Sequence, residues 1–373
     1  MSSLYLQTKN TTIRFLYKNI LKKIFFLRDP EAVHDHMTQM GIFLGSNGFT
    51  RFLTKKLFFF EDKSLHQHIH GIEFKNPVGL SAGFDKDALL PNILPEVGFG
   101  FEEVGSITGE PCVGNPKPRL WRIPRSQSLI VYYGLKNEGC EKIKQRLEGK
   151  KFRFPLGISI AKTNCADTAD TQKGITDYVK AYRVMSSVGD YDTINISCPN
   201  AFGGQPFTDK IRLDSLLTEL NKYRSKKPMF IKLSPDLSLS ELDDILELAK
   251  KHQVNGVVCS NLTKRRDNAK IQETELPENG GLSGKVVEDL ANQQIAYIYK
   301  KTEGKLTIIG VGGIFSAADA YKKIRLGASL VQLITGMIFE GPQLIGDINF
   351  GLTQLLKKDG FKNISEAIGK DNI

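Results

Sequence analysis

Eight short apolar runs, spread between residues 77 and 333, restrict this chain to very few folds. Helical patterns lie between most of them, for example at 173–187, 238–251, 286–301 and 316–326. Buried strands that alternate with helices pair in parallel, and eight of them predict a closed (β/α)8 TIM barrel. The runs are 77–81, 101–104, 155–160, 193–196, 229–233, 256–259, 306–310 and 329–333.

An open, doubly wound sheet is the alternative fold for the same alternation of strands and helices. That fold usually carries a G-x-G-x-x-G motif directly after its first strand, and no such motif follows residues 77–81. A chain of 373 residues is long for one domain but suits an α/β barrel. We therefore expect a barrel domain over residues 65–373 and a helical extension over residues 1–64.

Residues 12–27 have the pattern of an amphipathic helix, and a second helix is expected from Asp29-Pro30 to about Leu44. Charged residues interrupt the run of about 20 apolar residues that a transmembrane helix needs. The pattern favours a helix lying in a membrane interface; the alternative is a helical cap packed on its own barrel. The residues expected on the apolar face are Ile13, Leu16, Tyr17, Ile20, Ile24 and Leu27.

The formal charge of +10 is concentrated near the N-terminus, because residues 1–60 hold nine Lys or Arg and three Asp or Glu. These basic residues are interleaved with Phe, Ile and Leu, which favours a membrane surface over nucleic acid as the partner. No nucleic-acid-binding motif is recognisable. The five cysteines form no C-x-x-C pair, which predicts a reducing compartment and neither a disulfide framework nor a metal site.

The most distinctive strand end is that of the fourth run, which places Cys198 between Asn195 and Asn200. Chemistry in a (β/α)8 barrel takes place at the carboxyl ends of its strands. A thiol between two amides can act there as an acid or base beside a planar polar ligand. Spacing alone leaves the alternative open, in which Cys198 is an ordinary buried cysteine and the asparagines cap loops.

Other strand ends carry residues suited to a cofactor and an anion. Ala82 and Gly83 follow the first run and let a flat group approach the backbone, while Lys86 can meet a carboxylate. Lys232 lies inside the fifth run, where a buried ammonium needs an anionic partner. Glycine-rich turns are expected at 280–284, 310–313 and 335–336, and such turns form the usual phosphate site of these barrels. Flavin mononucleotide (FMN), a sugar phosphate or a nucleotide would each fit.

Taken together, these stretches resemble the dihydroorotate dehydrogenase family, and the extension resembles its quinone-linked, membrane-associated class. The resemblance covers nearly all of residues 13–357. It implies an FMN-binding barrel that oxidises dihydroorotate to orotate in pyrimidine (UMP) biosynthesis. It also implies a membrane quinone as acceptor and a peripheral position at the cytoplasmic face of the inner membrane. The most specific motifs are 75–87, 114–120, 195–200, 280–284 and 309–313. Residues 28–34 are similar to the start of the second helix in that class, in which two helices form the mouth of a hydrophobic tunnel for the quinone, so the resemblance implies the same role for residues 1–64.

The resemblance implies a role for individual residues as well. Cys198 would be the base that removes the C5 proton while a hydride passes from C6 to flavin N5. The implied substrate contacts are Lys86, Tyr133, Gly134, Leu135, Asn195, Asn200 and Asn261, with Arg122 on the quinone approach. The implied FMN contacts are Ala82, Gly83, Lys86, Ser106, Ser159, Asn195, Ser260, Gly284, Gly312, Gly313, Thr335 and Gly336, together with Lys232 at the N1/O2 edge.

The chain departs from the quinone-linked pattern at several of these positions. Cys198 replaces a usual serine and is typical of the soluble classes that use fumarate or NAD. Val131 and Leu262 replace a usual asparagine and threonine, and Ser159 and residues 161–163 also differ. These departures keep open a flavin barrel that uses fumarate or NAD or oxidises another dihydropyrimidine. A non-catalytic flavin- or phosphate-binding barrel is the third alternative.

Overall fold

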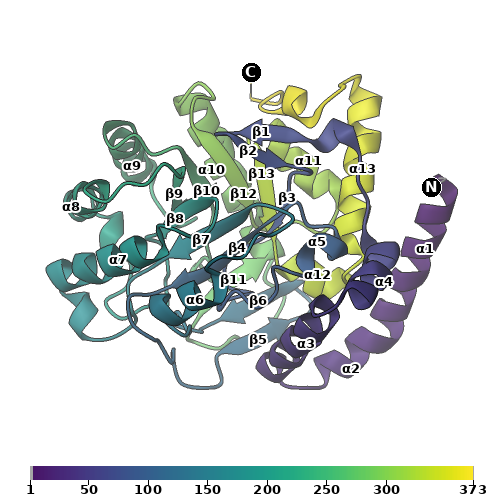
Figure 1. Cartoon of the computed structure of the whole chain (residues 1–373), viewed down its shortest axis with the longest axis horizontal. Helices are drawn as coiled ribbons and strands as arrows, with labels where there is room; N and C mark the ends of the chain where they lie inside the picture. The colour runs from purple at the N-terminus through teal and green to yellow at the C-terminus, as the bar shows by residue number, and fades with distance from the viewer. Residues whose placement is uncertain (1–2, 373) are drawn as a thin grey trace.

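The computed structural model describes residues 3–372 and contains the closed parallel barrel that the apolar runs predict (Figure 1). Neighbouring strands follow the order of the chain, and the last strand pairs with the first, Val331 lying opposite Val78. The (β/α)8 prediction is therefore confirmed. The barrel strands are β3 (Val78–Leu80), β4 (Phe101–Ile107), β7 (Leu156–Ile160), β8 (Tyr191–Asn195), β9 (Met229–Leu233), β10 (Gly256–Cys259), β12 (Thr307–Val311) and β13 (Leu330–Leu333).

Helices cover the outside of the barrel and bury their apolar faces against the strands. The expected helix at 238–251 is typical, because it begins with a capping box. The Ser238 hydroxyl accepts a hydrogen bond from the Glu241 N–H, and the Glu241 carboxylate accepts one from the Ser238 N–H. Its buried residues include Leu242, Ile245 and Leu248. The helices are α5 (Leu94–Val97), α6 (Cys140–Leu147), α7 (Thr171–Met185), α8 (Lys210–Asn221), α9 (Leu239–Lys251), α10 (Glu288–Lys301), α11 (Ala317–Arg325), α12 (Thr335–Glu340) and α13 (Leu344–Asp359).

An aromatic layer closes the amino ends of the barrel strands. Phe74 from the hairpin of β1 (Gln67–Ile69) and β2 (Ile72–Phe74) packs there against Phe101, Tyr191 and Phe230. Glycines leave space for these rings, since a Cβ on Gly157 would lie 2.1 Å from the Tyr191 ring. Because this layer is apolar and buried, the polar chemistry of the barrel is confined to the opposite end.

A small antiparallel sheet of β5 (Leu120–Ile123), β6 (Ser128–Val131) and β11 (Gly281–Gly284) stands beside the barrel. The expectation of a glycine-rich turn at 280–284 is wrong, because residues Gly281–Gly284 form a strand paired with β6. The glycines serve close packing there: a Cβ on Gly281 would lie 2.7 Å from the Leu262 Cβ. The glycine content alone therefore predicted a turn where the chain forms a strand, because the partner strand lies far away in the sequence.

The N-terminal extension is helical, with α1 (Ser3–Leu16), a π-helical segment (Tyr17–Leu21), α2 (Lys22–Phe26), α3 (Pro30–Gly45) and α4 (Gly48–Phe58). Asp29 caps α3 by accepting a hydrogen bond from the Ala32 N–H, which confirms the predicted helix start. In Figure 1 these helices lie together along one side of the barrel, next to α12 and α13.

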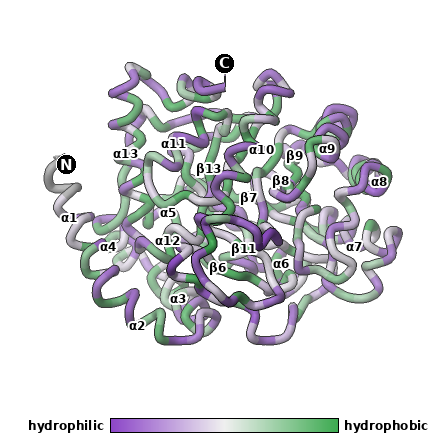
Figure 2. The backbone as a smooth tube through the Cα atoms, turned by 180° about the vertical axis from the view of Figure 1, so that it is seen from behind, coloured by the Kyte–Doolittle hydropathy of each residue, from purple (hydrophilic) through white to green (hydrophobic). Residues whose placement is uncertain are grey.

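The extension docks on the barrel through polar side chains. Arg14 pairs with Asp347 at 2.6 Å, Lys18 pairs with Glu340 at 2.6 Å, and Tyr17 donates a hydrogen bond to the Ile338 carbonyl. Apolar side chains of the same helices remain exposed, and hydrophobic and hydrophilic residues alternate along them in Figure 2. Within residues 3–372, no helix combines the length and apolar character needed to cross a bilayer.

A buried ion pair fixes α3 to the chain leading into β5. The Arg119 guanidinium donates to both carboxylate oxygens of Glu31 at 2.8–3.2 Å. Both residues are at most 6% exposed. A bidentate pair of this kind is strong as long as both charges are present.

Removing one partner of this pair should destabilise the protein. We expect Glu31→Ala to lower the free energy of unfolding in urea by about 3 kcal/mol, because it leaves the Arg119 charge buried without its partner. Asp35 on the same helix has a largely exposed carboxylate, so Asp35→Ala should cost no more than about 0.5 kcal/mol. Equal losses in the two variants would contradict a special role for the buried pair.

Candidate active site

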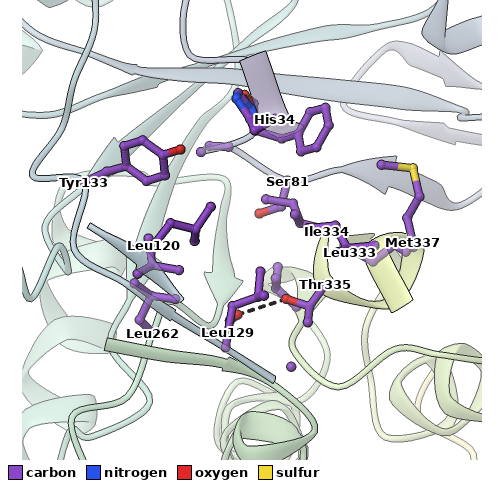
Figure 3. A pocket seen from close by; sticks show the side chains of 18 of the residues that line it. His34, Ser81, Leu120, Leu129, Tyr133, Leu262, Leu333, Ile334, Thr335 and Met337 are labelled. Atoms are coloured by element: carbon purple, nitrogen blue, oxygen red, sulfur yellow. Dashed lines mark hydrogen bonds between the residues drawn. The ribbon is translucent and has the colours of Figure 1, made fainter. Parts of the chain in front are cut away.

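A single cavity of about 320 Å³ lies at the carboxyl ends of the barrel strands, beneath the small sheet and the helical extension (Figure 3). Arg122 and every predicted substrate and FMN contact except Ser159 line it. Ser159 lies behind this lining, where its hydroxyl is hydrogen-bonded to the Ser106 hydroxyl at 2.8 Å. The structure thus brings together residues that are more than 200 positions apart in the sequence.

Three asparagines form an amide cluster at the end of β8. Asn195 donates to the Ser106 hydroxyl at 2.8 Å and accepts a hydrogen bond from Asn261 at 3.2 Å. Asn200 donates to the Val131 carbonyl at 2.7 Å, so residue 131 contributes its backbone whatever its side chain. The buried Asn200 Oδ1 has no hydrogen-bond partner among the described residues. It is therefore an acceptor that a ligand in the cavity can use.

Cys198 lies beside this cluster and lines the same cavity. Burial raises the pKa of its thiol above the ordinary range, and the positive charge of Lys162 opposes that shift. Lys162 also holds the segment that follows Cys198, because its ammonium donates to the Phe202 carbonyl at 2.8 Å. Cys198 is thus a protonatable group that lines the same cavity as the three asparagines.

Lys86 approaches the cavity from the loop after β3, with its ammonium 3.9 Å from the centre of the Tyr133 ring. Removal from bulk water, and then repulsion by Lys136, lower the pKa of Lys86 to about 8. At neutral pH this side chain is a cation with few local partners, which suits an anionic ligand group.

The opposite end of the cavity is lined by bare backbone at Gly284, Gly312, Gly313 and Gly336. Gly312 and Gly313 have φ of +106° and +75°, which L side chains rarely adopt. A Cβ on Gly336 would lie 2.0 Å from the Ile314 carbonyl oxygen. Only glycine therefore fits at these positions, and a ligand can approach the main chain closely.

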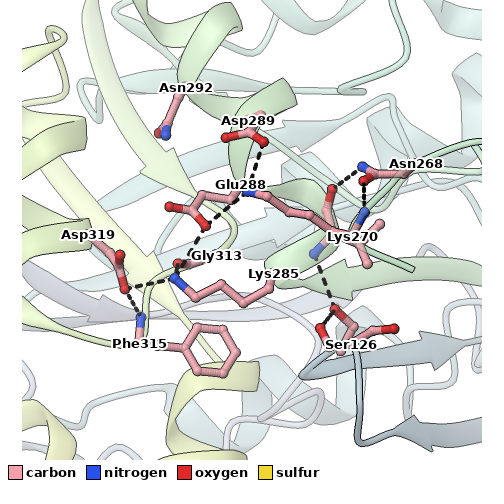
Figure 4. A network of polar contacts seen from close by, with 12 residues as sticks. Ser126, Asn268, Lys270, Lys285, Glu288, Asp289, Asn292, Gly313, Phe315 and Asp319 are labelled. Carbon is pink, nitrogen blue, oxygen red and sulfur yellow. Dashed lines mark hydrogen bonds and ion pairs between the residues drawn. The ribbon is translucent and has the colours of Figure 1, made fainter. Parts of the chain in front are cut away.

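A polar network supports this glycine-lined end from outside (Figure 4). The Lys285 ammonium lies 3.2 Å from the Gly313 carbonyl oxygen, 3.3 Å from Glu288 and 3.1 Å from Asp319. Asp319 also accepts the Phe315 N–H at 2.8 Å. The loops after β11 and β12 are therefore held in one arrangement.

The entrance includes residues that the sequence placed on the second helix without giving any of them an individual role. His34 on α3 donates from Nε2 to the Phe84 carbonyl at 2.9 Å, and burial lowers its pKa to about 4. The helical spacing of Pro30, Val33, His34 and Met37 is a signal that could have indicated their common cavity-facing side. The predicted Arg122 lies nearby, 4.7 Å from the Phe26 ring. Other entrance residues are the apolar Phe25, Leu120, Leu129, Met337 and Ile338.

These features define a (β/α)8-barrel protein with its ligand cavity in the position usual for that class. A family model described as dihydroorotate dehydrogenase matches residues 64–356. The chain therefore belongs to the dihydroorotate dehydrogenase family, a family of flavin-dependent oxidoreductases.

Two relatives illustrate how far the similarity extends along the chain. The dihydroorotate dehydrogenase (quinone) of Trichormus variabilis is 37% identical over 372 residues, which cover 95% of this chain and 98% of the relative. The enzyme of the same name from Haloarcula marismortui is 39% identical over 310 residues, covering 83% of this chain and 87% of its own.

The fold has close counterparts among solved structures. The dihydroorotate dehydrogenase of Eimeria tenella in complex with ferulenol superposes with a TM-score of 0.82 at 30% identity, covering 92% of this chain and 96% of that one. The ligand-free form of the Eimeria enzyme gives a TM-score of 0.80 at 31% identity, covering 92% of this chain and 99% of that one. In both comparisons the overlap extends well beyond the barrel strands.

Proposed function

We propose that this protein oxidises dihydroorotate to orotate in pyrimidine biosynthesis, with FMN as its bound cofactor and a membrane quinone as electron acceptor. The observation that carries this proposal is one cavity with three different regions. An amide cluster beside Cys198 and Lys86 suits a cyclic amide carboxylate, a glycine-lined end suits a phosphate, and an apolar entrance suits a quinone. The quinone-linked relatives, which match nearly the whole chain, support the same reaction.

The residues present fit FMN. The Ser260 hydroxyl is buried without a hydrogen-bond partner among the described residues. The Lys232 ammonium lies 3.3 Å from the Ser81 hydroxyl and 4.0 Å from the Glu103 carboxylate. The bare backbone at Gly312 and Gly313 leaves room for a phosphate that main-chain N–H groups can bind. When bound, FMN would accept a hydride from the substrate and pass the electrons to the quinone.

The side chains of this chain would then bind the substrate and move its proton. Cys198 would remove the proton at C5 as a general base. Asn195, Asn200 and Asn261 would hold the ring amides, and Lys86 would bind the carboxylate. Lys232 would face the N1/O2 edge of the flavin, where negative charge develops. Backbone groups at Tyr133, Gly134 and Leu135 would complete the substrate site.

The character of the entrance favours a quinone over fumarate or NAD. Phe25, Phe26, Leu120 and Leu129 present apolar walls to a ligand that passes between α2 and α3. Fumarate and NAD carry charges that lose hydration energy against these apolar walls. A quinone head group with an isoprenoid tail has no such cost.

The extension supplies a surface for peripheral membrane binding, which we propose for residues 1–60 at the cytoplasmic face of the inner membrane. Its large apolar side chains remain exposed, and lysines and arginines lie among them. Such a surface binds the interface of a bilayer that contains anionic lipids. The exposed apolar residues of α1 to α4 are Phe15, Leu16, Ile20, Leu21, Ile24, Leu27, Met40, Phe43, Phe49, Phe52, Leu53 and Leu57.

Replacing the proposed base should slow the first half-reaction. We expect Cys198→Ala to reduce the rate of anaerobic flavin bleaching by dihydroorotate at least about a hundredfold. In the unchanged protein this rate should rise with pH, because a base acts when deprotonated and burial raises the thiol pKa. Cys165 is exposed, so Cys165→Ala should bleach normally. Near-normal bleaching in Cys198→Ala would exclude the base role, and no bleaching in the unchanged protein would exclude the proposed reaction.

The charge on Lys86 should make orotate binding depend on pH. Only the ammonium attracts the carboxylate, and its pKa of about 8 in the unliganded site means that it loses its proton as the pH rises through that value. We expect the Kd for orotate, measured by flavin absorbance, to rise above pH 8 by up to about tenfold per pH unit. Lys136→Met should move this loss to higher pH by removing a repelling cation. An unchanged pH profile in Lys86→Met would contradict the assignment.

The exposed apolar residues of the extension should control membrane binding. We expect the triple variant Leu27→Gln, Phe43→Gln and Phe49→Gln to bind phosphatidylglycerol-containing vesicles at least about tenfold more weakly, because each change removes apolar area from the interface. The control carries Ile211→Gln and Leu239→Gln, which alter equally exposed residues on the barrel. Equal vesicle binding by the triple variant and the control would contradict this surface.

A further inference from the structure

A polar layer lies inside the barrel between the aromatic layer and the cavity. It consists of Glu103 on β4, Thr193 on β8, Lys232 on β9 and Gln332 on β13. All four side chains are buried, with at most 4% exposure. A charged pair enclosed in this way interacts more strongly than a pair in water, because few solvent dipoles screen it.

Glu103 is surrounded by hydrogen-bond donors. Its Oε2 accepts from the Thr193 hydroxyl at 2.9 Å, from the Gln332 amide at 3.2 Å and from the Tyr191 hydroxyl at 3.5 Å. These three contacts fix the position of one carboxylate oxygen. Its Oε1 has no hydrogen-bond partner among the described residues and lies 4.0 Å from the Lys232 ammonium.

Lys232 depends on this carboxylate for its charge. Burial lowers the pKa of Lys232, and attraction to Glu103 and then to Cys198 opposes that shift. The contact with the Ser81 hydroxyl is long and neutral. The ionisable groups that face this pair are Cys198 above it and Tyr191 below it, and neither replaces a carboxylate at neutral pH.

We propose that Glu103 is the internal counter-ion that keeps Lys232 an ammonium ion before the flavin is reduced. The inference rests on the proposed function, because it assumes that FMN lies against Lys232. Glu103 touches neither substrate nor cofactor in this arrangement. It is a positioning residue that acts through the charge of Lys232.

The charge of Lys232 matters because hydride transfer adds a negative charge to the flavin. A hydride carries two electrons and one proton, so its arrival on a neutral ring adds one negative charge. With the ammonium already in place, that charge is balanced at once by the protein. Without it, a second proton would have to enter a barrel whose lower end is closed by Phe74, Phe101, Tyr191 and Phe230.

The test is the reduction potential of the bound flavin in holoenzyme carrying Glu103→Gln, which keeps the side-chain shape and removes the charge. At pH 8 we expect the equilibrium constant for reduction to fall at least tenfold, equivalent to about 30 mV for a two-electron couple. Glu102→Gln is the matched control. Glu102 is adjacent and equally buried, but it lies on the other face of β4 against Asp85, so its replacement should leave the potential unchanged.

A double-mutant cycle assigns the effect to Lys232. In a Lys232→Met background, Glu103→Gln should no longer change the potential. The proposal is overturned if Glu103→Gln leaves the reduction potential unchanged or raises it. It is also overturned if Glu102→Gln lowers the potential as much, or if Glu103→Gln lowers it as much in the Lys232→Met background. Purified protein without flavin would instead contradict the proposed function.

A measurement on the unchanged holoenzyme keeps the proposal testable if Glu103→Gln fails to fold. Because Lys232 already holds its proton, reduction should take up one proton per two electrons. The potential should then fall by about 30 mV per pH unit between pH 7 and 9. A fall of about 60 mV per unit would mean that a second proton enters and would overturn the proposal.

Discussion

Closure of the parallel barrel is the constraint on which the rest of this structure depends. Since all eight strands point the same way, the residues that follow them meet at one mouth. Pairing of β13 with β3 closes the ring, so the loop that carries Lys86 and the glycine-lined loops border one cavity. The aromatic layer at the other end excludes water from below. Closure therefore both gathers the polar groups and keeps them in surroundings where charges act strongly.

Patterns within a few residues of each other predicted the barrel well. Each of the eight apolar runs became a strand, because β-branched and other apolar residues buried on both faces leave few alternatives. The position of the candidate site followed from the same pattern, since strand ends define the mouth. Cys198, Lys86 and the glycines could therefore be placed at one site without knowledge of any contact.

Contacts between distant residues could not be predicted in the same way. Gly281–Gly284 pairs with β6, about 150 positions earlier, and no local feature distinguishes that strand from a turn. Ser159 was expected at the cofactor, yet Ser106 lies in front of it. The sequence also predicted that Lys232 needs an anion but did not identify Glu103, because the residues on β4 and β9 meet only across the barrel interior.

The helical extension is attached to the barrel by two kinds of ion pair. Glu31 and Arg119 are buried, whereas Arg14 and Lys18 are about 40% exposed in their pairs with Asp347 and Glu340. Dissolved salt screens exposed pairs much more than buried ones. Dissolved salt should therefore weaken the pairs made by α1 and the π-helical segment more than the buried pair that fixes α3 beside the cavity.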